Sequence, residues 1–493
     1  MVDRVIVRRG TFLDSVALML MSRDAAELDG VEQASIVNAT PLNVELLQRQ
    51  SFRLPADEEP PGPNDLLIAI RAEGDEPLGA ALALIEERLQ RRPGADGGGA
   101  ALAAARSVTS AARRREELSL ALVTVPGRHA TYECARALDA GLDVLCFSNG
   151  PSLDAEAALK SRANALGLLM MGPDCGTAIL DGAVLGFGNA VRSGPVGIVG
   201  ASGTGIQAIS CRLDAAGVGI SQAIGTGGRD LSARVGGATT LRAIELLAAD
   251  SNTEAIVVVA KSPDPAVARQ VNAAGGRAGK PVVLAFPGFA GEGLGLEQAG
   301  SLEEGAAGIA AAVGAKLPPP ARTGSVEVTP GAIRGLFSGG TLRDEALGIV
   351  NAAAGAGTEL ERAAPGEHVL VDLGDERFTE GRPHPMIDLS LRISTLQEQA
   401  QDPSVGVLLL DVVLGYGAHP DPAAELAPAL ARALEARPGE LTAVVSLCGT
   451  DGDPQDVDGQ ADRLHGAGAV VTRSNVDAAE LALAAAGLGS AVS

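Results

Sequence analysis

A chain of 493 residues is too long for a single hydrophobic core, so its length predicts about three or four domains. A net charge of −22 argues against a broad basic face for nucleic acid or anionic lipid. The N-terminus lacks signal-peptide features and no run is apolar enough to span a bilayer, so we expect a cytoplasmic protein without membrane contact. The five cysteines are scattered without a CxxC pair, so we predict neither a disulfide nor a metal site.

Strand and helix patterns alternate through the first 117 residues, which we expect to form an N-terminal α/β domain with a connector. Short apolar runs predict the strands, and amphipathic periodicity predicts the helices between them. The strands are predicted at 5–8, 33–38 and 65–71, and the helices at 12–28, 42–50 and 78–91. Residues 92–117 contain GADGGG and then an Ala/Arg-rich piece, which predicts a flexible connector with a helical end.

The same alternation continues in three further segments, at 118–193, 194–318 and 330–493, with a proline-rich linker after Lys316. Strands are predicted at 118–125, 142–147, 196–199, 255–260, 281–286, 405–413, 441–447 and 469–472. Strands alternating with helices favour the α/β class, with several doubly wound, Rossmann-like or flavodoxin-like parallel sheets. In such sheets ligands bind beyond the carboxyl ends of the strands, where this chain places its glycine turns.

One glycine-rich turn follows the predicted strand at 196–199 and leads into helical periodicity from Ile206. Free backbone N–H groups and the helix dipole favour an anion at such a turn. The phosphate-binding candidates are Ser202, Gly203, Thr204 and Gly205. A plain helix cap is the alternative explanation.

A second glycine turn lies one strand further along the chain, at Gly225-Thr-Gly-Gly-Arg-Asp230. Its arginine suits bidentate pairing with a carboxylate or phosphate, although a solvated arginine explains it nearly as well. We therefore expect a second anion-facing loop, with Arg229 as a catalytic candidate. The substrate-binding candidates from this turn are Thr226, Gly227, Gly228 and Asp230.

The loop Gly381-Arg-Pro-His-Pro-Met-Ile-Asp388 brings a cation, an imidazole and a carboxylate together between stiffening prolines. Arg382 is expected to clamp a substrate carboxylate, and His384 to donate to a carbonyl oxygen or move a proton. Asp388 is a substrate-binding candidate. A rigid loop with a surface ion pair is the competing interpretation.

Two further candidates lie at other predicted strand ends. His419 follows Gly415-Tyr-Gly-Ala, and is a catalytic candidate beside that turn. Cys175 and Gly176 are substrate-binding candidates in Gly-Pro-Asp-Cys-Gly. A thiolate role for this cysteine competes with that of a small turn residue.

Several separated motifs occur in a recognisable order. They are Gly172-Pro-Asp-Cys-Gly, Val196-Gly-Ile-Val-Gly-Ala-Ser-Gly-Thr, Gly225-Thr-Gly-Gly-Arg-Asp, Thr253-Glu-Ala-Ile-Val and Lys280-Pro-Val-Val. Over residues 120–315 this series resembles the α subunit of succinyl-CoA synthetase. The last segment is similar in layout to the carboxyl domain of the synthetase β subunit.

The whole chain is similar to the FdrA family of acyl-CoA-synthetase-like proteins. The motifs that carry this resemblance are Arg9-Gly-Thr-Phe-Leu-Asp-Ser-Val, Ser338-Gly-Gly-Thr-Leu, Gly381-Arg-Pro-His-Pro-Met-Ile-Asp388 and Leu410-Asp-Val-Val-Leu-Gly-Tyr-Gly417. The resemblance implies a phosphate cradle in which two helix N-termini converge on one anion. One would begin at Ser202 and the other at Gly415, Tyr416 and Gly417, which are therefore phosphate-binding candidates.

The departures from the synthetase bear on the chemistry. Gln298 stands where the resemblance would put the phosphate-carrying histidine, and glutamine cannot form a phosphoramidate by nucleophilic attack. The stretch between the two synthetase-like parts is too short for an ATP-grasp domain, and no GxxxxGK[ST] turn replaces it. The stretch Gly10-Thr-Phe-Leu-Asp-Ser15 resembles the CoA loop of the synthetase only loosely. CoA therefore remains a possible ligand, and no cofactor is firmly predicted.

Membership of the FdrA family implies a subunit of a carbamoyltransferase that uses carbamoyl phosphate, phosphate and oxamate or a ureido acid in purine and allantoin nitrogen metabolism. The expected partners are small acyl phosphates and carboxylates, with companion subunits, a second copy of the chain, or both. One alternative is an acyl-CoA synthetase or acyl-CoA:phosphate transferase. Another is a non-catalytic scaffold or binding subunit that relies on partners.

Overall fold

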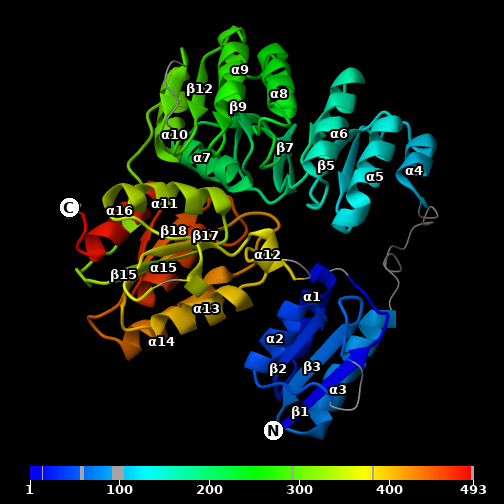
Figure 1. The fold of residues 1–493 in the computed structure, drawn as a ribbon, viewed down its shortest axis with the longest axis vertical. Coiled ribbons are helices and arrows are strands. Elements are labelled where there is room, and N and C mark those ends of the chain that lie inside the picture. The colour runs from blue at the N-terminus through cyan, green and yellow to red at the C-terminus, as the bar shows by residue number, and fades with distance from the viewer. Residues whose placement is uncertain are drawn as a thin grey trace. The chain divides into compact units, whose positions relative to one another are not determined.

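The computed structural model describes residues 1–13, 15–55, 60–90, 105–289, 294–362, 364–379 and 382–489. They divide into two compact units (Figure 1): the first comprises the N-terminal 104 residues with 374–388, and the second comprises 105–373 with 389–493. No helix among the described residues is long and apolar enough to cross a membrane. The first half of the predicted connector at 92–117, up to residue 104, lies outside the described residues.

The first unit has a three-stranded sheet with two covered faces. Its order is β1–β3–β2 and both pairings are antiparallel, which differs from the parallel sheet that we expected. Strand β3 is central because nearly all its residues are apolar and buried (LLIAIRA). Helices α1 and α3 cover one face, while α2 and Phe52 cover the other. The elements are β1 (Val2–Arg8), α1 (Ser15–Ala26), β2 (Val31–Asn38), α2 (Pro41–Arg49), β3 (Leu66–Ala72), α3 (Asp75–Gln90) and α12 (Glu376–Thr379).

The second unit begins with a small parallel sheet, β4–β5–β6, against which α5 and α6 pack. Its strands are short and its core is built from alanine, leucine, valine and two cysteines. Helix α4 packs on α5. The elements are α4 (Val108–Arg114), β4 (Leu120–Val123), α5 (Gly127–Asp139), β5 (Asp143–Cys146), α6 (Leu153–Ala165) and β6 (Met170–Met171).

A seven-stranded sheet follows, in the order β13–β12–β11–β9–β10–β7–β8. The first five strands are parallel, and the hairpin β7–β8 adds an antiparallel edge, so the predicted boundary at 193 falls within this sheet. Helices α7 and α10 cover one face, and α8 and α9 the other (Figure 1). The elements are β7 (Thr177–Leu180), β8 (Ala183–Gly186), β9 (Ser193–Gly200), α7 (Gly203–Ala215), β10 (Ile220–Gly225), α8 (Ala238–Ala249), β11 (Ala255–Val259), α9 (Pro265–Gly276), β12 (Val282–Ala285), β13 (Glu297–Ala299) and α10 (Leu302–Ala312).

The last sheet has six strands in the order β14–β19–β18–β17–β15–β16, and all but β14 are parallel. Helices α11 and α16 cover one face, and α13, α14 and α15 the other. The elements are β14 (Arg322–Thr323), β15 (Ala332–Phe337), α11 (Gly340–Ala353), η1 (Leu360–Arg362), β16 (Val369–Asp372), α13 (Ser390–Ala400), β17 (Val405–Val413), α14 (Pro422–Ala436), β18 (Thr442–Cys448), α15 (Val457–Gly466), β19 (Val470–Thr472) and α16 (Asn475–Ala485).

The two larger sheets meet through their helices. Helix α7 contacts α11, and α10 contacts α16, so four helices form a seam between the sheets. The predicted α/β class with several parallel sheets is confirmed. Which of the predicted glycine turns lie close together depends on how the helices of the two sheets pack across this seam.

Candidate functional site

Helices α7 and α11 begin beside one another at the seam. Ser202 caps α7 by accepting a 2.8 Å hydrogen bond from the Gly205 amide. Its hydroxyl also donates to Thr341 Oγ1, at 2.6 Å, and Thr341 is the second residue of α11. Since each helix N-terminus carries partial positive charge, the two helices concentrate positive potential at one place.

The approach of the two helices depends on glycine. A Cβ at Gly339 would lie 2.7 Å from Thr204 Cγ2, closer than side-chain atoms tolerate. Gly339 is the N-cap residue of α11 and forms no side-chain capping hydrogen bond. The first turn of α11 therefore presents backbone N–H groups without the cap that Ser202 gives to α7.

Asp411, on β17, fixes the turn that leads into α11. Its fully buried carboxylate accepts hydrogen bonds from the amides of Ser338 and Gly339, both at 2.8 Å. The Arg392 guanidinium, on α13, lies 3.0 Å from the same carboxylate. Burial lowers the pKa of Arg392, while Asp411 opposes this by favouring the charged form. Asp411, paired with Arg392, thus holds the turn before α11 in place.

Lys261 supplies a cation close to the start of α11. It follows β11, and its Nζ forms an ion pair with Asp344 Oδ2 at 3.0 Å. A Cβ at Gly340 would lie 3.4 Å from Lys261 Nζ and 2.6 Å from Asp372 Oδ2. Lys261 is not among the residues predicted from the sequence, although a basic residue at the carboxyl end of a parallel strand is a recognisable signal for such a site.

A buried hydroxyl lies on the other side of α7. Thr177 Oγ1, on β7, is 2.9 Å from the position that a Cβ at Gly203 would occupy. It has no hydrogen-bond partner among the described residues, and Thr177 is 2% exposed. Buried hydroxyls are normally hydrogen-bonded, so an acceptor bound at this place would complete the pairing.

The turn at Gly415–Gly417 does not begin a helix, which corrects the expected second half of the cradle. Helix α14 starts only at Pro422, after the cap Asp421. Instead, Tyr416 pairs with Gly188 through two backbone hydrogen bonds, at 2.7 and 3.3 Å. The helix whose N-terminus meets that of α7 is α11, which follows β15. The end of β17 contacts α7 through its side, where Gln207 donates to the Leu414 carbonyl at 3.3 Å.

His419 is engaged within its own loop. Its Nδ1 accepts a hydrogen bond from the Asp421 amide at 3.1 Å, and its Nε2 lies 3.1 Å from Glu425 Oε1. Both partners belong to the start of α14. His419 is therefore held by contacts to the start of α14, and its catalytic role stays a prediction.

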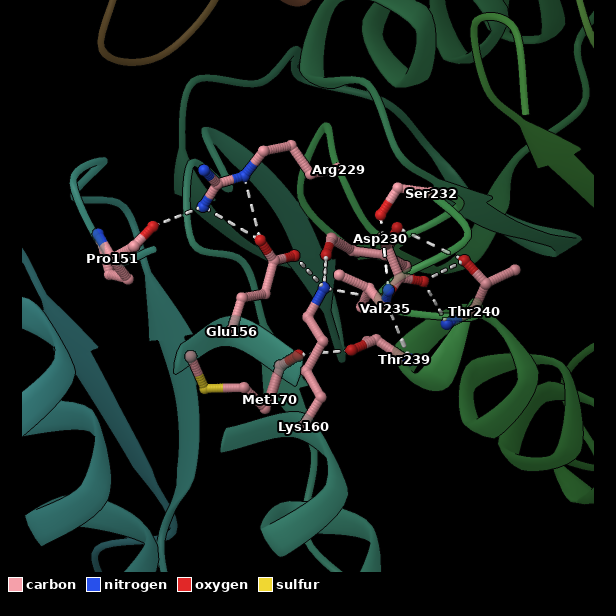
Figure 2. A network of polar contacts seen from close by, with 11 residues as sticks. Pro151, Glu156, Lys160, Met170, Arg229, Asp230, Ser232, Val235, Thr239 and Thr240 are labelled. Atoms are coloured by element: carbon pink, nitrogen blue, oxygen red, sulfur yellow. Dashed lines mark hydrogen bonds and ion pairs between the residues drawn. The ribbon is translucent and has the colours of Figure 1, made fainter. Parts of the chain in front are cut away.

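The predicted second anion-facing loop is largely internal (Figure 2). Lys160 Nζ, fully buried on α6, lies 2.8 Å from Glu156, from Asp230 and from the Thr226 carbonyl. Asp230 also accepts hydrogen bonds from the amides of Thr239 and Thr240, so it neutralises the start of α8. Thr226 and Asp230 are fully buried, and their contact with substrate stays a prediction.

The remaining residues of this loop are held by the same network. Arg229 forms an ion pair with Glu156 at 3.0 Å and donates to the Pro151 carbonyl at 2.7 Å. Gly227 packs against the Pro173 carbonyl with a positive φ of 87°, so the position requires glycine. Gly228 is exposed. Within this turn, Arg229 and Gly228 are the residues that a ligand can reach.

Cys175 is a buried turn residue. Its thiol is 2% exposed and donates to the Thr177 carbonyl at 3.6 Å. Burial raises the pKa of Cys175 to about 12, so it is a thiol at neutral pH. The adjacent Gly176 accepts a 2.8 Å hydrogen bond from the Phe187 amide. These contacts favour the alternative of a small turn residue, and substrate binding by Cys175 stays a prediction.

Arg382, His384 and Asp388 lie in the 374–388 segment, which belongs to the first unit. His384 Nδ1 accepts a 3.2 Å hydrogen bond from the Met386 amide. Burial lowers the pKa of Arg382, while Asp388 partly offsets that effect. Arg382 Nη1 is buried and has no hydrogen-bond partner among the described residues. The contacts of these three residues with a substrate remain predictions.

Two other predicted positions have clear surroundings. Gln298 lies on the edge strand β13, where its side chain is exposed. The Gly10 amide donates to Asp65 at 2.8 Å, and this bond, with that from Gly62, holds the pKa of Asp65 below its usual range. The Asp65 carboxylate thus occupies the first turn of the stretch that loosely resembles the CoA loop.

Comparisons with known proteins agree on the type of chain. Three family descriptions match: "CoA binding domain" over residues 191–288, "CoA-ligase" over 336–485 and "AllF, heavy metal-associated domain" over 1–105. The chain is 38% identical to the uncharacterized protein YahF of Escherichia coli, over 97% of this chain and 98% of that protein. It is 29% identical to a succinate–CoA ligase α subunit of Archaeoglobus fulgidus, over 40% of this chain and 68% of that protein. A solved structure, the dinucleotide-forming acetyl-coenzyme A synthetase 1 of Ca. Korarchaeum cryptofilum, matches with a TM-score of 0.33 and 16% identity, over 75% of this chain and 82% of that one.

The N-terminal match raises the question of a heavy metal. Residues 1–105 contain neither cysteine nor histidine, and the first of either in the chain is His129. Soft metals are held by thiolate and imidazole ligands, so this domain does not fit a heavy-metal site. We assign it no metal-dependent step.

Proposed function

Because the chain belongs to the FdrA family of succinyl-CoA-synthetase-like proteins, we propose that it is a carbamoyltransferase subunit that binds carbamoyl phosphate where α7 and α11 meet. Oxamate or a related amide would be the acceptor, and companion subunits or a second copy would complete the enzyme. The proposal places the protein in the cytoplasm, in purine and allantoin nitrogen metabolism. The observation that carries it is the hydrogen bond between Ser202 and Thr341, which brings two helix N-termini to one point.

The site suits the phosphoryl group of an acyl phosphate. Two helix N-termini attract a dianion, and Lys261 places a cation near Gly340, where Asp344 pairs with it and Asp372 lies close by. The hydroxyl of Thr177, for which the described part of the chain offers no hydrogen-bond partner, is a further donor next to Gly203. Together these groups would hold the phosphate and stabilise the charge that it gains on leaving.

The proposed transfer needs no covalent intermediate on the protein. The amide nitrogen of oxamate attacks the carbamoyl carbon, a C–N bond forms, and the bond between that carbon and the bridging phosphate oxygen breaks. The nitrogen loses one proton and the released phosphate gains one, which gives oxalurate and hydrogen phosphate. The contribution of the protein is to position both substrates and to stabilise the departing anion.

Arg382 and His384, in the 374–388 segment of the first unit, are proposed by themselves as contacts for a carboxylate substrate. A buried guanidinium nitrogen without a hydrogen-bond partner among the described residues can receive one oxygen of a carboxylate. His384 would donate to the amide carbonyl. The absence of a histidine at Gln298 agrees with a reaction that requires no phosphohistidine.

Calorimetric titration of the full chain tests the ligand. We expect heat with carbamoyl phosphate and with inorganic phosphate, and none with CoA at the same concentrations. Heat with CoA alone would overturn the carbamoyl phosphate assignment. If none of the three ligands gives measurable heat, companion subunits are needed to complete the site. The titration should then be repeated on the purified complex.

A charge reversal tests the position of the site. Ser202→Asp keeps a good helix cap but adds negative charge between the two N-termini, so carbamoyl phosphate affinity should fall by at least tenfold. Ser152→Asp makes the same change at the exposed cap of α6 and should leave affinity unchanged. Equal affinities for both variants would exclude the α7–α11 junction.

A second candidate is an acyl-CoA:phosphate transferase or acyl-CoA synthetase. The observation that favours it is the match of residues 191–288 and 336–485 to families described by CoA. The same phosphate site would then serve a CoA thioester. This candidate predicts CoA binding and release of free CoA from an acyl-CoA when phosphate is added.

A further inference from the structure

Two cysteines that are far apart in the sequence meet at the seam. Cys211 lies on α7 and Cys448 ends β18, and their sulfur atoms are 3.7 Å apart across 237 residues of chain. The two side chains are 7% and 8% exposed. They therefore form a dithiol that joins the two larger sheets.

This dithiol is reachable from a cavity. Both cysteines line a cavity of about 340 Å³, together with Arg212, Leu342 and Arg473. The volume is sufficient for a small organic molecule. In contrast, Cys134 and Cys146 are fully buried, Cys175 is 2% exposed, and none of the three lines the cavity.

We propose that Cys211 and Cys448 are a site of reversible oxidation, at which a small disulfide compound entering the cavity converts the pair into an intramolecular disulfide. A disulfide bond is about 2.05 Å long, so the two sulfur atoms must approach by about 1.7 Å. Each thiol is at the surface of its own element, one on a helix and one at the end of a strand. A small change of side-chain torsion and a slight shift at the seam bring them together.

The chemistry is thiol–disulfide exchange. The thiolate of one cysteine attacks the disulfide RSSR, forms a mixed disulfide and releases one RS⁻. The second cysteine then attacks the protein sulfur of that mixed disulfide, which forms the Cys211–Cys448 bond and releases a second RS⁻. The two protons lost by the cysteines pass to the two leaving thiolates, so the pair is oxidised and RSSR is reduced to two RSH.

The surroundings make this exchange slow. Burial raises the pKa of Cys211 well above its ordinary value, and the hydrogen bond with Cys448 raises it further. Because the thiolate is the nucleophile, the pair remains reduced under mild conditions. Reaction then depends on a reagent small enough to enter the cavity.

The bond would lock the two halves of the proposed anion site. Cys211 is on the same helix as Ser202, and β18 lies in the same sheet as the strand that leads into α11. A cross-link closing such a long loop restricts the unfolded chain strongly. The oxidised protein should therefore unfold at a higher temperature than the reduced one.

The test treats the full chain with hydroxyethyl disulfide, blocks the remaining thiols with an alkylating agent, and maps the peptides by mass spectrometry without reduction. The expected result is one linked pair of peptides, containing Cys211 and Cys448, with the mass lower by two hydrogens. The unfolding temperature should rise and return to its starting value after reduction. Mixed disulfides without a link, or two thiols that remain alkylatable, would overturn the proposal.

The single variants Cys211→Ala and Cys448→Ala are the controls. Each should lose the linked peptides and the rise in unfolding temperature, while its thermal transition before oxidation remains cooperative. If a variant does not fold, the peptide map of the unaltered chain still decides the outcome. A linked pair that includes Cys134, Cys146 or Cys175 would also contradict the assignment.

Discussion

Ser202 Oγ donates a 2.6 Å hydrogen bond to Thr341 Oγ1, although 139 residues separate the two in the sequence. This bond joins the first turns of two helices from two different sheets. It makes the seam between the sheets an anion-binding candidate. The predictions below test the parts of the structure that hold this seam in place.

Gly339→Ala should push α7 and α11 apart. The added Cβ would lie 2.7 Å from Thr204, so we expect the free energy of unfolding to fall by about 1–3 kcal/mol. Phosphate affinity should fall with it. The matched control is Gly348→Ala in the same helix, where no atom lies within 4 Å and the substitution should stabilise by about 0.5–1 kcal/mol. Urea unfolding measures both, and equal losses would contradict the role of close approach.

Asp411→Asn should destabilise the protein strongly. The substitution leaves the buried Arg392 charge without its anion and weakens the turn before α11, which costs about 3–5 kcal/mol. Glu359→Gln, in the exposed pair with Arg362, should change the free energy of unfolding by less than about 0.5 kcal/mol. Similar effects of the two substitutions in urea titrations would show that Asp411 does not anchor the turn.

Lys160→Met should destabilise the loop at 225–230. Without the ammonium group, the carboxylates of Glu156 and Asp230 are buried together, and we expect a loss of about 3–5 kcal/mol in the free energy of unfolding. Amide hydrogen exchange in this loop should accelerate as well. Lys316→Met, at an exposed position, serves as the control. Unchanged exchange in the variant would exclude Lys160 as the support of the loop.

Glu345 should make stability depend on pH. Burial raises its pKa to about 7, above the ordinary 4.5, although hydrogen bonds from Asn475 and the Leu302 amide oppose this. The folded protein therefore binds this proton more tightly than the unfolded chain does. The stabilisation is complete below about pH 4.5 and is lost as the pH rises through about 7, a change of about 3 kcal/mol.

Glu345→Gln removes this titrating group and keeps a hydrogen-bonding side chain. The difference in free energy of unfolding between the variant and the unaltered chain should move in favour of the variant as the pH rises from 4.5 to 7. Urea unfolding at five or six pH values in that interval measures it. A difference that does not vary with pH would contradict the raised pKa of Glu345.

Much of the local structure could be predicted from the sequence. The strand predicted at 405–413 is β17, and the helix predicted at 78–91 is α3, because apolar runs and 3.6-residue periodicity are local signals. Ser202 was recognised as a helix start, since cap residues lie within a few positions of the amides that they accept from. The family could also be recognised, because its motifs are short and ordered.

The partners of these elements could not be predicted in the same way. We expected Gly415–Gly417 to face Ser202, yet the structure brings α11 there and pairs Tyr416 with Gly188. Both turns follow parallel strands and are rich in glycine, so composition does not distinguish them. Which one meets the N-terminus of α7 depends on how the six-stranded sheet packs its strand ends and helices across the seam.

The sequence by itself therefore determined the α/β class, the family and the residues that begin α7. Only the tertiary structure decided that Lys261 lies near the start of α11, that Asp230 is buried with Lys160, and that Cys211 meets Cys448. The physical reason is the separation along the chain of the residues that set each feature. Hydrogen bonding and periodicity within an element are set by neighbouring residues, whereas contacts across the seam are set by how two complete sheets pack their helices together.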